Sequence, residues 1–281
     1  MQNIRELIGK DDREALEKLA REIFSGQTGT KPGTGILKNI FSLLDLTSLG
    51  GSDTGRDIAD LCRKACSFKE KGMTGPAAVC VYPVFIRQVR DLISGTGIRV
   101  AAVAGGFPSG QTALRVKLDE VWYAVDEGAE EIDMVISRGR FLEGDTAYVR
   151  EEITKIRELT KGLCLKVILE TGELKNLYTV FNASELAIIA GADFIKTSTG
   201  KISPAATIPA VMTMCHAIRE HYNKTGKKVG IKPAGGISEP KQALEYFLIV
   251  KEMLGPEWLT PGLFRIGASR LADNLAMIID Q

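Results

Sequence analysis

The sequence predicts an α/β protein, a (β/α)8 barrel of the TIM type with an N-terminal helical extension. Short apolar segments rich in β-branched residues alternate with longer amphipathic segments along most of the chain. Strands separated by helices pair in parallel through right-handed crossovers. Eight such units occupy about 240 residues, close to the size of a typical (β/α)8 barrel. An open doubly wound sheet is the alternative, but the first strand is followed by LLDLTSLGGSD and not by a GxGxxG fingerprint.

Eight segments have the length and composition of buried strands, and helical patterns lie between them. The expected strands span residues 41–47, 77–83, 98–105, 130–137, 165–171, 193–199, 228–235 and 264–269. Clear amphipathic patterns cover residues 56–68, 112–128, 147–160 and 210–226. Gly128 and Gly191 stand just before two of the strands, where a glycine commonly ends the preceding helix.

The first 40 residues precede the alternating pattern. An amphipathic helix is expected over residues 11–24, with Leu16 on its apolar face. The glycine-rich segment 25–35 contains no GxxxxGK[ST] phosphate-binding loop, so a flexible linker is the better interpretation. We therefore divide the chain into a helix and tether, 1–40, and a catalytic barrel, 41–281, that is expected to be complete without them.

Composition excludes several classes of protein. Lys and Arg number 36 and Asp and Glu 35, so the net charge of +1 does not suit bulk binding to nucleic acid or to a membrane surface. No apolar run is long enough to span a bilayer, and the charged N-terminus is not a secretory signal. Five cysteines without a CxxC pair favour a reducing, cytoplasmic location. Two histidines leave little material for a Ser-His-Asp triad or a histidine metal site.

Charged residues interrupt five of the expected strands. They are Asp45, Asp133, Lys166, Lys196 and Lys232. Strands of a parallel barrel are buried on both faces, and an isolated buried charge is very costly, so these groups should be paired or functional. A structural ion-pair network in the barrel core is the alternative. Lys196 and Lys232 stand near the C-terminal ends of their strands, where the active sites of such barrels are built.

Two lysines on adjacent strands suggest amine chemistry. Like charges repel, and the simplest relief is that one lysine loses its proton. Burial and a neighbouring cation both lower the pKa of a lysine from its usual value of about 10.4. The free amine can then attack a carbonyl carbon and form a Schiff base. A nearby carboxylate could move the protons, and Asp133 is the candidate.

Glycines follow the last two strands. Gly235 and Gly236 come after strand seven, and Gly267 and Ser269 come at the end of strand eight. The corresponding loops of such barrels commonly hold a phosphate through backbone N–H groups. Ordinary tight turns are the alternative for either loop alone. The segment GGFPSG is also glycine-rich, and we expect Phe107 to form an apolar wall of the pocket.

Several of these segments resemble one known family, the deoxyribose-phosphate aldolases, which are class I aldolases. The matching segments, between about residues 41 and 279, are LLDLT, VCVYP, EEIDMVIS, LKVILETGEL, GADFIKTSTGK, VGIKPAGGI and FRIGAS. The resemblance implies reversible cleavage of 2-deoxy-D-ribose 5-phosphate to acetaldehyde and D-glyceraldehyde 3-phosphate, in deoxyribonucleoside catabolism. It implies small-molecule substrates and neither a metal nor an organic cofactor. Some members form homodimers.

The family's residue roles are carried over where this sequence matches. Lys196 corresponds to the Schiff-base lysine, Lys232 to the lysine that perturbs it, and Asp133 to the proton relay. The positions that match the substrate site are Asp45, Thr47, Cys80, Phe107, Lys166 and Lys201. The positions that match the phosphate end are Gly235, Gly236, Gly267 and Ser269.

The chain departs from the family pattern at three places. Its first 40 residues exceed the compact bacterial form, and Arg270 stands where some members have a second serine. It ends at Gln281, without the tail and terminal tyrosine of some members, which puts the efficiency of proton transfer in doubt. Two other functions remain: another lysine-dependent lyase or transaldolase, and a non-catalytic phosphosugar-binding barrel. Lys196, Lys232 and Asp133 together argue against the second.

Overall fold

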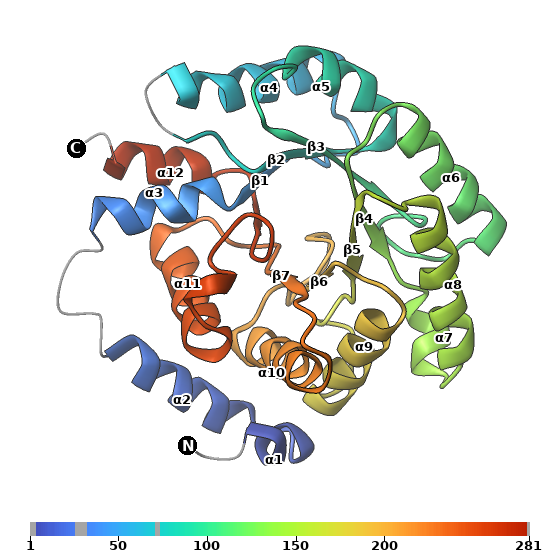
Figure 1. Ribbon diagram of the computed structural model, residues 1–281, viewed down its shortest axis with the longest axis vertical. Helices are drawn as coiled ribbons and strands as arrows, with labels where there is room; N and C mark the ends of the chain where they lie inside the picture. The colour runs from blue at the N-terminus through green and yellow to red at the C-terminus, as the bar shows by residue number, and fades with distance from the viewer. Residues whose placement is uncertain (1–3, 26–32, 71–73, 280–281) are drawn as a thin grey trace.

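Eight parallel strands lie at the centre of the protein in a computed structural model that describes residues 4–25, 33–70 and 74–279 (Figure 1). The strands are β1 (Leu44–Thr47), β2 (Ala78–Val81), β3 (Arg99–Ala104), β4 (Glu131–Val135), β5 (Cys164–Ile168), β6 (Phe194–Lys196), β7 (Gly230–Lys232) and β8 (Ile266–Ala268). Their order is β7-β6-β5-β4-β3-β2-β1-β8. Parallel bridges from Ile231 to Phe264 and from Ala234 to Gly267 join the two ends of this sheet. The predicted barrel is confirmed.

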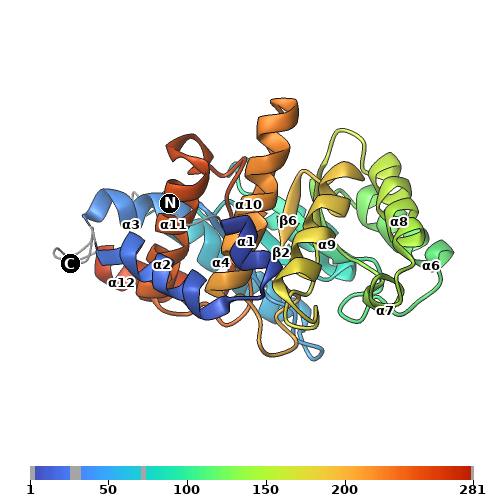
Figure 2. The same cartoon turned by 90° about the horizontal axis from the view of Figure 1, so that it is seen from below.

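Helices surround the strands on the outside (Figures 1 and 2). They are α4 (Gly55–Glu70), α5 (Ile86–Leu92), α6 (Leu114–Asp126), α7 (Arg138–Leu142), α8 (Thr146–Leu159), α9 (Leu177–Ile189), α10 (Ile208–Thr225), α11 (Pro240–Leu254) and α12 (Leu271–Ile279), with short 3-10 helices at Pro83–Phe85 and Pro256–Trp258. None of the helices in the described ranges combines the length and the apolar character needed to cross a membrane.

Local signals start several helices soon after a strand ends. The side chains of Asp145, Asn176 and Thr207 accept a hydrogen bond from a backbone N–H in the first turn of α8, α9 and α10 respectively. Helix α10 ends at Gly226, whose φ of 71° is left-handed. The three N-caps fix where α8, α9 and α10 begin, and hence where the loops at the C-terminal end of the barrel end.

The side chains of the strands pack in two regions, one between the strands and the helices and one inside the barrel. Between strands and helices lies one large apolar cluster that includes Val79, Ile132 and Val167. Inside the barrel, β2 and β3 contribute a small apolar cluster around Cys80 and Val103. The charges that the sequence placed within strands occupy other interior positions, and all five of those side chains are buried. The polar groups are therefore gathered on one side of the interior.

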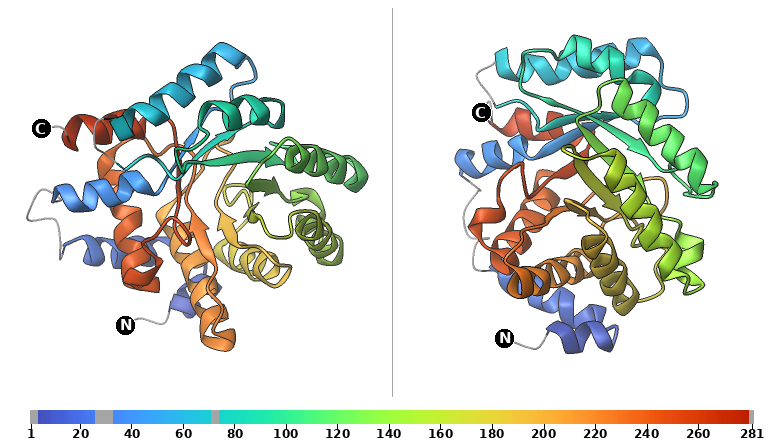
Figure 3. Two further views of the ribbon diagram at one scale, coloured as in Figure 1. Left: turned by 45° about the horizontal axis from the view of Figure 1, so that its top comes forward. Right: turned by 45° about the vertical axis from the view of Figure 1, so that its right-hand side comes forward.

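The N-terminal segment packs closely on the barrel. Helices α1 (Ile4–Gly9) and α2 (Arg13–Ser25) lie along the outside of α9, α10 and α11 (Figures 1 and 3). Leu16 and Ala20 are fully buried there and belong to the large apolar cluster. The backbone N–H of Leu177 donates to Asp11 at 2.8 Å, which ties the turn before α2 to the start of α9.

The boundary expected at residue 40 falls inside a helix. Helix α3 (Thr34–Ser42) packs against α11 and α12, and only Leu43 separates it from β1. Most of the tether expected over residues 25–35 lies outside the described residues. Helix α3 therefore belongs to the barrel, and the N-terminal extension ends before it.

We expect Leu16→Ala to lower the free energy of unfolding by about 2–4 kcal/mol, because it removes a fully buried side chain between α2 and the barrel. Lys18→Ala, an exposed position on the same helix, is the matched control and should change stability little. Urea unfolding followed by circular dichroism measures both. Equal stability of the two variants would instead support a separable segment, as the sequence predicted.

Candidate active site

A cavity of about 190 Å³ opens at the C-terminal ends of β1, β6, β7 and β8. Seven of the residues predicted from the sequence line it: Thr47, Lys196, Lys201, Gly235, Gly236, Gly267 and Ser269. Arg270 lines it as well, so the position that departs from the family pattern adds a cation to the wall. The cavity thus combines one predicted catalytic lysine with the glycines expected to hold a phosphate.

The carboxylate of Asp133 lies beside this cavity between three lysines. Its Oδ2 accepts hydrogen bonds from Lys196 Nζ at 2.7 Å and from Lys232 Nζ at 2.6 Å. Its Oδ1 accepts one from Lys166 Nζ at 2.7 Å. Of these three lysines, only Lys196 lines the cavity. The structure therefore brings together the predicted trio of Lys196, Lys232 and Asp133 in direct contact.

A network of ion pairs continues from Asp133 toward the opposite end of the barrel. Asp45 pairs with Lys232 and with Arg265. Glu131 pairs with Lys166 at 2.6 Å and with Arg265 at 2.7 Å. Four cationic side chains thus share three carboxylates, and each of the seven is at least 94% buried in its side chain. If all were ionised, one positive charge would be in excess among side chains that are almost fully buried.

The three lysines differ in how the network affects them. Burial, reinforced by the charge of Lys232, lowers the pKa of Lys196 although Asp133 opposes this. Burial also disfavours the charged form of Lys232 and Lys166, but their carboxylate partners outweigh it and raise the pKa of each. The pKa of the Asp133 carboxyl lies well below its usual value, because the three lysines outweigh its burial. Lys196 is therefore the lysine of this group that loses its proton most readily.

Four other predicted residues lie outside the cavity wall. Asp45 and Lys166 are fully buried within the network. Cys80 is buried in the small apolar cluster, where burial raises the pKa of its thiol. Phe107 packs against the same cluster, with its ring 5.8 Å from that of Tyr82. The contact of these residues with a substrate stays a prediction.

Glu170 holds the loop that follows β6. It has a left-handed φ of 56° and its side chain is fully buried. Its carboxylate accepts from the N–H and hydroxyl of Thr199 and from Arg138 at 3.0 Å. The N–H of Lys201 in turn donates to Thr199 Oγ1, and Lys201 Nζ donates to the carbonyl of Leu49. Glu170 thereby keeps Lys201 on the cavity wall, a role that the sequence analysis missed.

The glycines allow the loops after β7 and β8 to approach closely. Gly235 and Gly236 have φ of 87° and 75°. A Cβ on Gly235 would stand 2.6 Å from Ala205 Cβ, and one on Gly267 would stand 2.8 Å from Ala234 Cβ. A Cβ on Gly236 would meet no atom within 4 Å. Gly235 and Gly267 are thus required by packing, whereas Gly236 borders open space at the cavity.

Glu131 and Arg265 were not identified from the sequence. Each lies at or next to the first residue of its strand, where a charged side chain usually reaches solvent. A charge at this position therefore does not stand out in the sequence as a buried one. The alternation that placed Asp133 inside the barrel applies equally to Glu131, two residues earlier. That pattern was the available signal for Glu131.

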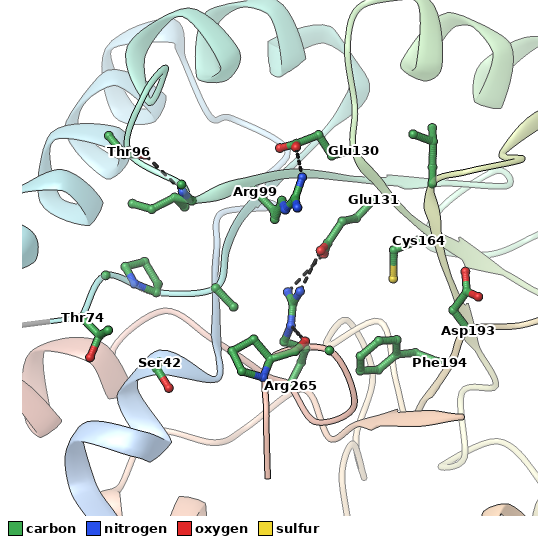
Figure 4. Close-up of a pocket in the computed structure, with 18 of the residues that line it drawn as sticks. Ser42, Thr74, Thr96, Arg99, Glu130, Glu131, Cys164, Asp193, Phe194 and Arg265 are labelled. Atoms are coloured by element: carbon green, nitrogen blue, oxygen red, sulfur yellow. Dashed lines mark hydrogen bonds and ion pairs between the residues drawn. The ribbon is translucent and has the colours of Figure 1, made fainter. Parts of the chain in front are cut away.

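A larger cavity, of about 740 Å³, opens at the N-terminal end of the barrel and is lined in part by Glu131, Arg265 and Cys164 (Figure 4). Figure 4 shows the Arg265 guanidinium reaching the Glu131 carboxylate. The ion network therefore extends between two cavities, with Lys196 at one and Arg265 at the other. Within the described ranges, no group of three or more His, Cys, Asp or Glu side chains is arranged to hold a metal ion.

Comparisons with known proteins agree with this geometry. Residues 40–247 match the family described as DeoC/LacD family aldolase. A deoxyribose-phosphate aldolase from Mus musculus is 46% identical over 247 residues, which cover 83% of this chain and 77% of the mouse protein. One from Agrobacterium fabrum is 42% identical over 240 residues, covering 85% and 89%.

A solved structure shows the same fold. The deoxyribose phosphate aldolase from Aeropyrum pernix, described as having a unique tetrameric structure, superposes with a TM-score of 0.70 at 26% identity, covering 87% of this chain and 92% of that one. The resemblance indicated by the sequence motifs is confirmed. The barrel, its lysine-lined cavity and these matches together establish that the chain belongs to the DeoC/LacD family of aldolases.

Proposed function

We propose that this protein is a deoxyribose-phosphate aldolase that cleaves 2-deoxy-D-ribose 5-phosphate reversibly to acetaldehyde and D-glyceraldehyde 3-phosphate. One observation carries the proposal. Lys196 is the lysine of the network that both lines the cavity and has a lowered pKa. The names of the mouse and Agrobacterium relatives support the substrate. A place in deoxyribonucleoside catabolism follows from that substrate.

The reaction begins with the free amine of Lys196. Its nitrogen adds to the aldehyde carbon C1 of the open-chain sugar, and loss of water gives an iminium ion. Asp133 touches the amines of both Lys196 and Lys232, so it is placed to exchange the protons of this step, directly or through a water. The iminium ion keeps the positive charge next to the Asp133 carboxylate, which stabilises it.

Cleavage then uses the iminium as an electron sink. Removal of the C3 hydroxyl proton lets the bond between C2 and C3 break. Its electron pair moves toward the nitrogen, which gives an enamine and releases D-glyceraldehyde 3-phosphate. Protonation of the enamine at C2 and hydrolysis of the resulting iminium release acetaldehyde and restore the Lys196 amine.

The phosphate would bind at the glycine-rich end of the cavity. Gly235, Gly236 and Gly267 let the backbone approach an anion closely, and Ser269 lies on the same wall. Lys201 and Arg270 line the cavity too and supply positive charge. This end of the cavity thus suits a phosphate at C5 while C1 reaches Lys196.

We also propose that the reaction needs no metal or organic cofactor, because the lysine itself supplies the electron sink. Its partners are the phosphosugar and the two aldehydes, with no role for nucleic acid or a membrane. A cytoplasmic location is supported by the odd number of cysteines. Assembly into a homodimer or a larger oligomer is supported by the tetrameric description of the Aeropyrum pernix relative.

The first test asks which lysine forms the Schiff base. Incubation with acetaldehyde and then borohydride should leave an ethyl group on Lys196, because Lys196 lines the cavity and has the lowered pKa. Peptide mass mapping locates the label, and Lys196→Arg should abolish it because guanidinium stays charged. A label on Lys232 in the unaltered protein would reverse the two roles.

A separate cleavage assay tests the substrate. Release of acetaldehyde from deoxyribose 5-phosphate supports the proposed activity. In the reverse direction, condensation that uses dihydroxyacetone phosphate instead of acetaldehyde as the nucleophilic partner would identify a different lysine-dependent lyase. Binding of the phosphosugar without any Schiff base would identify a non-catalytic barrel.

The second test asks what Lys232 does. Lys232→Leu removes the cation that shares Asp133 Oδ2 with Lys196, so the pKa of Lys196 should rise. A higher pKa leaves less free amine near neutral pH, so the rate should fall steeply there and recover partly as pH rises toward about 10. The apolar leucine opposes part of this effect by desolvation. Lys232→Arg keeps the charge and is the control, and a profile with unchanged midpoint in Lys232→Leu would contradict the role.

The third test locates the phosphate. Gly236→Val should weaken binding of deoxyribose 5-phosphate at least tenfold more than binding of deoxyribose, because the new side chain occupies the open space beside the cavity. Gly226→Val is the matched control, since Gly226 has a similar φ of 71°, equally open surroundings and a place at the end of α10. Calorimetric titration of both sugars measures the difference. An equal loss for both would place the phosphate elsewhere.

A further inference from the structure

Arg265 lies at the end of the ion network that is farthest from Lys196. Its Nη1 donates to Asp45 Oδ1 at 2.5 Å, and its Nη2 donates to Glu131 Oε1 at 2.7 Å. Its Nε donates to the carbonyl of Pro261, and its guanidinium lies 5.9 Å from the centre of the Phe194 ring. Only 5% of the residue is exposed. Arginine does not lose its proton in proteins, so this position carries a permanent positive charge.

Two paths of ion pairs connect Arg265 to Asp133. On one path, Asp45 is shared between Arg265 and Lys232, and Lys232 then contacts Asp133. On the other path, Glu131 is shared between Arg265 and Lys166, and Lys166 then contacts Asp133. Each path ends on the carboxylate that Lys196 also contacts.

The shared partners make the lysines compete for negative charge. Asp45 divides its charge among Arg265, Lys232 and, at 3.6 Å, Lys166. Glu131 divides its charge between Arg265 and Lys166, so Lys232 and Lys166 both draw on Asp133 as well. Without the charge of Arg265, three carboxylates would match three lysines. Lys232 and Lys166 would then need Asp133 less, and Asp133 would hold the proton of Lys196 more firmly.

We propose that Arg265 and Glu131 are positioning residues that set the charge balance beneath Lys196, and that the permanent charge of Arg265 is what leaves Lys196 as the free amine. This role rests on the proposed Schiff-base function of Lys196. It extends control of the nucleophile to the opposite end of the barrel, to residues that line the other cavity and not the one that Lys196 lines.

The other titratable groups near these residues do not supply the balancing charge. Lys196 faces Asp133 on β4, Lys232 on β7 and Cys80 on β2. Burial keeps the pKa of the Cys80 thiol raised and raises that of Cys164, beside Glu131, to about 12, so both thiols are neutral. Arg265 faces Asp45 and Glu131. The balance is therefore decided by the four cations and three carboxylates of the network.

The test separates charge from geometry at residue 265. Arg265→Gln removes the charge and introduces an amide that can still donate hydrogen bonds. Arg265→Lys keeps the charge and loses the planar guanidinium with its paired donors. The readout is the rate of ethyl labelling of Lys196 by acetaldehyde and cyanoborohydride between about pH 5 and pH 10, beside the pH profile of kcat/KM. Circular dichroism and thermal unfolding establish that each variant is folded.

We expect the acid limb of both profiles to move up by about one pH unit in Arg265→Gln, which is tenfold less free amine at a fixed pH below the midpoint. Arg265→Lys should keep the midpoint of the unaltered protein. Glu131→Gln removes a negative charge and should move the limb to lower pH, and the double variant Arg265→Gln with Glu131→Gln should return it. These opposite directions would not arise from a general loss of stability.

The outcomes distinguish this inference from the proposed function. No labelling of Lys196 in the unaltered protein would overturn the function itself. Labelling of Lys196 with the same midpoint in Arg265→Gln would leave the function standing and overturn the role of Arg265. If Arg265→Gln does not fold, the pH profiles of Glu131→Gln decide the question alone. An acid limb of Glu131→Gln at the same pH as in the unaltered protein would overturn the proposal.

Discussion

Three lysines contact one carboxylate in the interior of the barrel, and the chemistry proposed for the protein depends on this contact. Asp133 accepts from Lys166, Lys196 and Lys232 at 2.6–2.7 Å. A buried cation is stable only when a negative charge compensates it, and one carboxylate cannot compensate three. Asp45 and Glu131 compensate Lys232 and Lys166. Lys196 has Asp133 as its partner in this network, so the excess charge is relieved there.

Glycines in the strands leave room inside the barrel for the charged side chains of the network. A Cβ on Gly267 would lie 3.2 Å from Lys232 Cε, and one on Gly230 would lie 2.4 Å from the Phe194 ring. Side chains at these two positions would therefore collide with the residues that carry or border the network. On the opposite side, Cys80 and Val103 fill the interior with small apolar groups. The interior is thus packed so that the charged side chains converge on one side.

The N-terminal helices α1 and α2 pack on the outside of the barrel and do not form the cavity. Helices α1 and α2 bury Leu16 and Ala20 against the barrel's own helices, on a flank away from the ends of the strands. The loops that form the cavity are held instead by hydrogen bonds between neighbouring loops, such as those from Thr199 to Glu170. Stability from the N-terminal segment and precision at the cavity therefore come from different sets of contacts.

The sequence by itself determined the barrel and pointed to three charged residues at the centre of the candidate site. Alternation of apolar strands and amphipathic helices is a local property, and a lysine or aspartate inside a buried strand is visible without coordinates. Lys196, Lys232 and Asp133 could be identified for this reason. The docking of α2 could not, because an amphipathic face shows that a partner exists and does not say which one.

The family resemblance assigned the reactive role to Lys196, but only the tertiary structure supplied a physical reason that distinguishes it from Lys232. Lys196 and Lys232 have the same chemistry and the same place at the end of a strand, so their neighbours decide between them. Lys232 also meets Asp45, and Asp45 in turn meets Arg265, a contact between residues 220 positions apart in the sequence. A lysine's pKa depends on the charges within a few ångströms, and those charges come together only when the barrel closes.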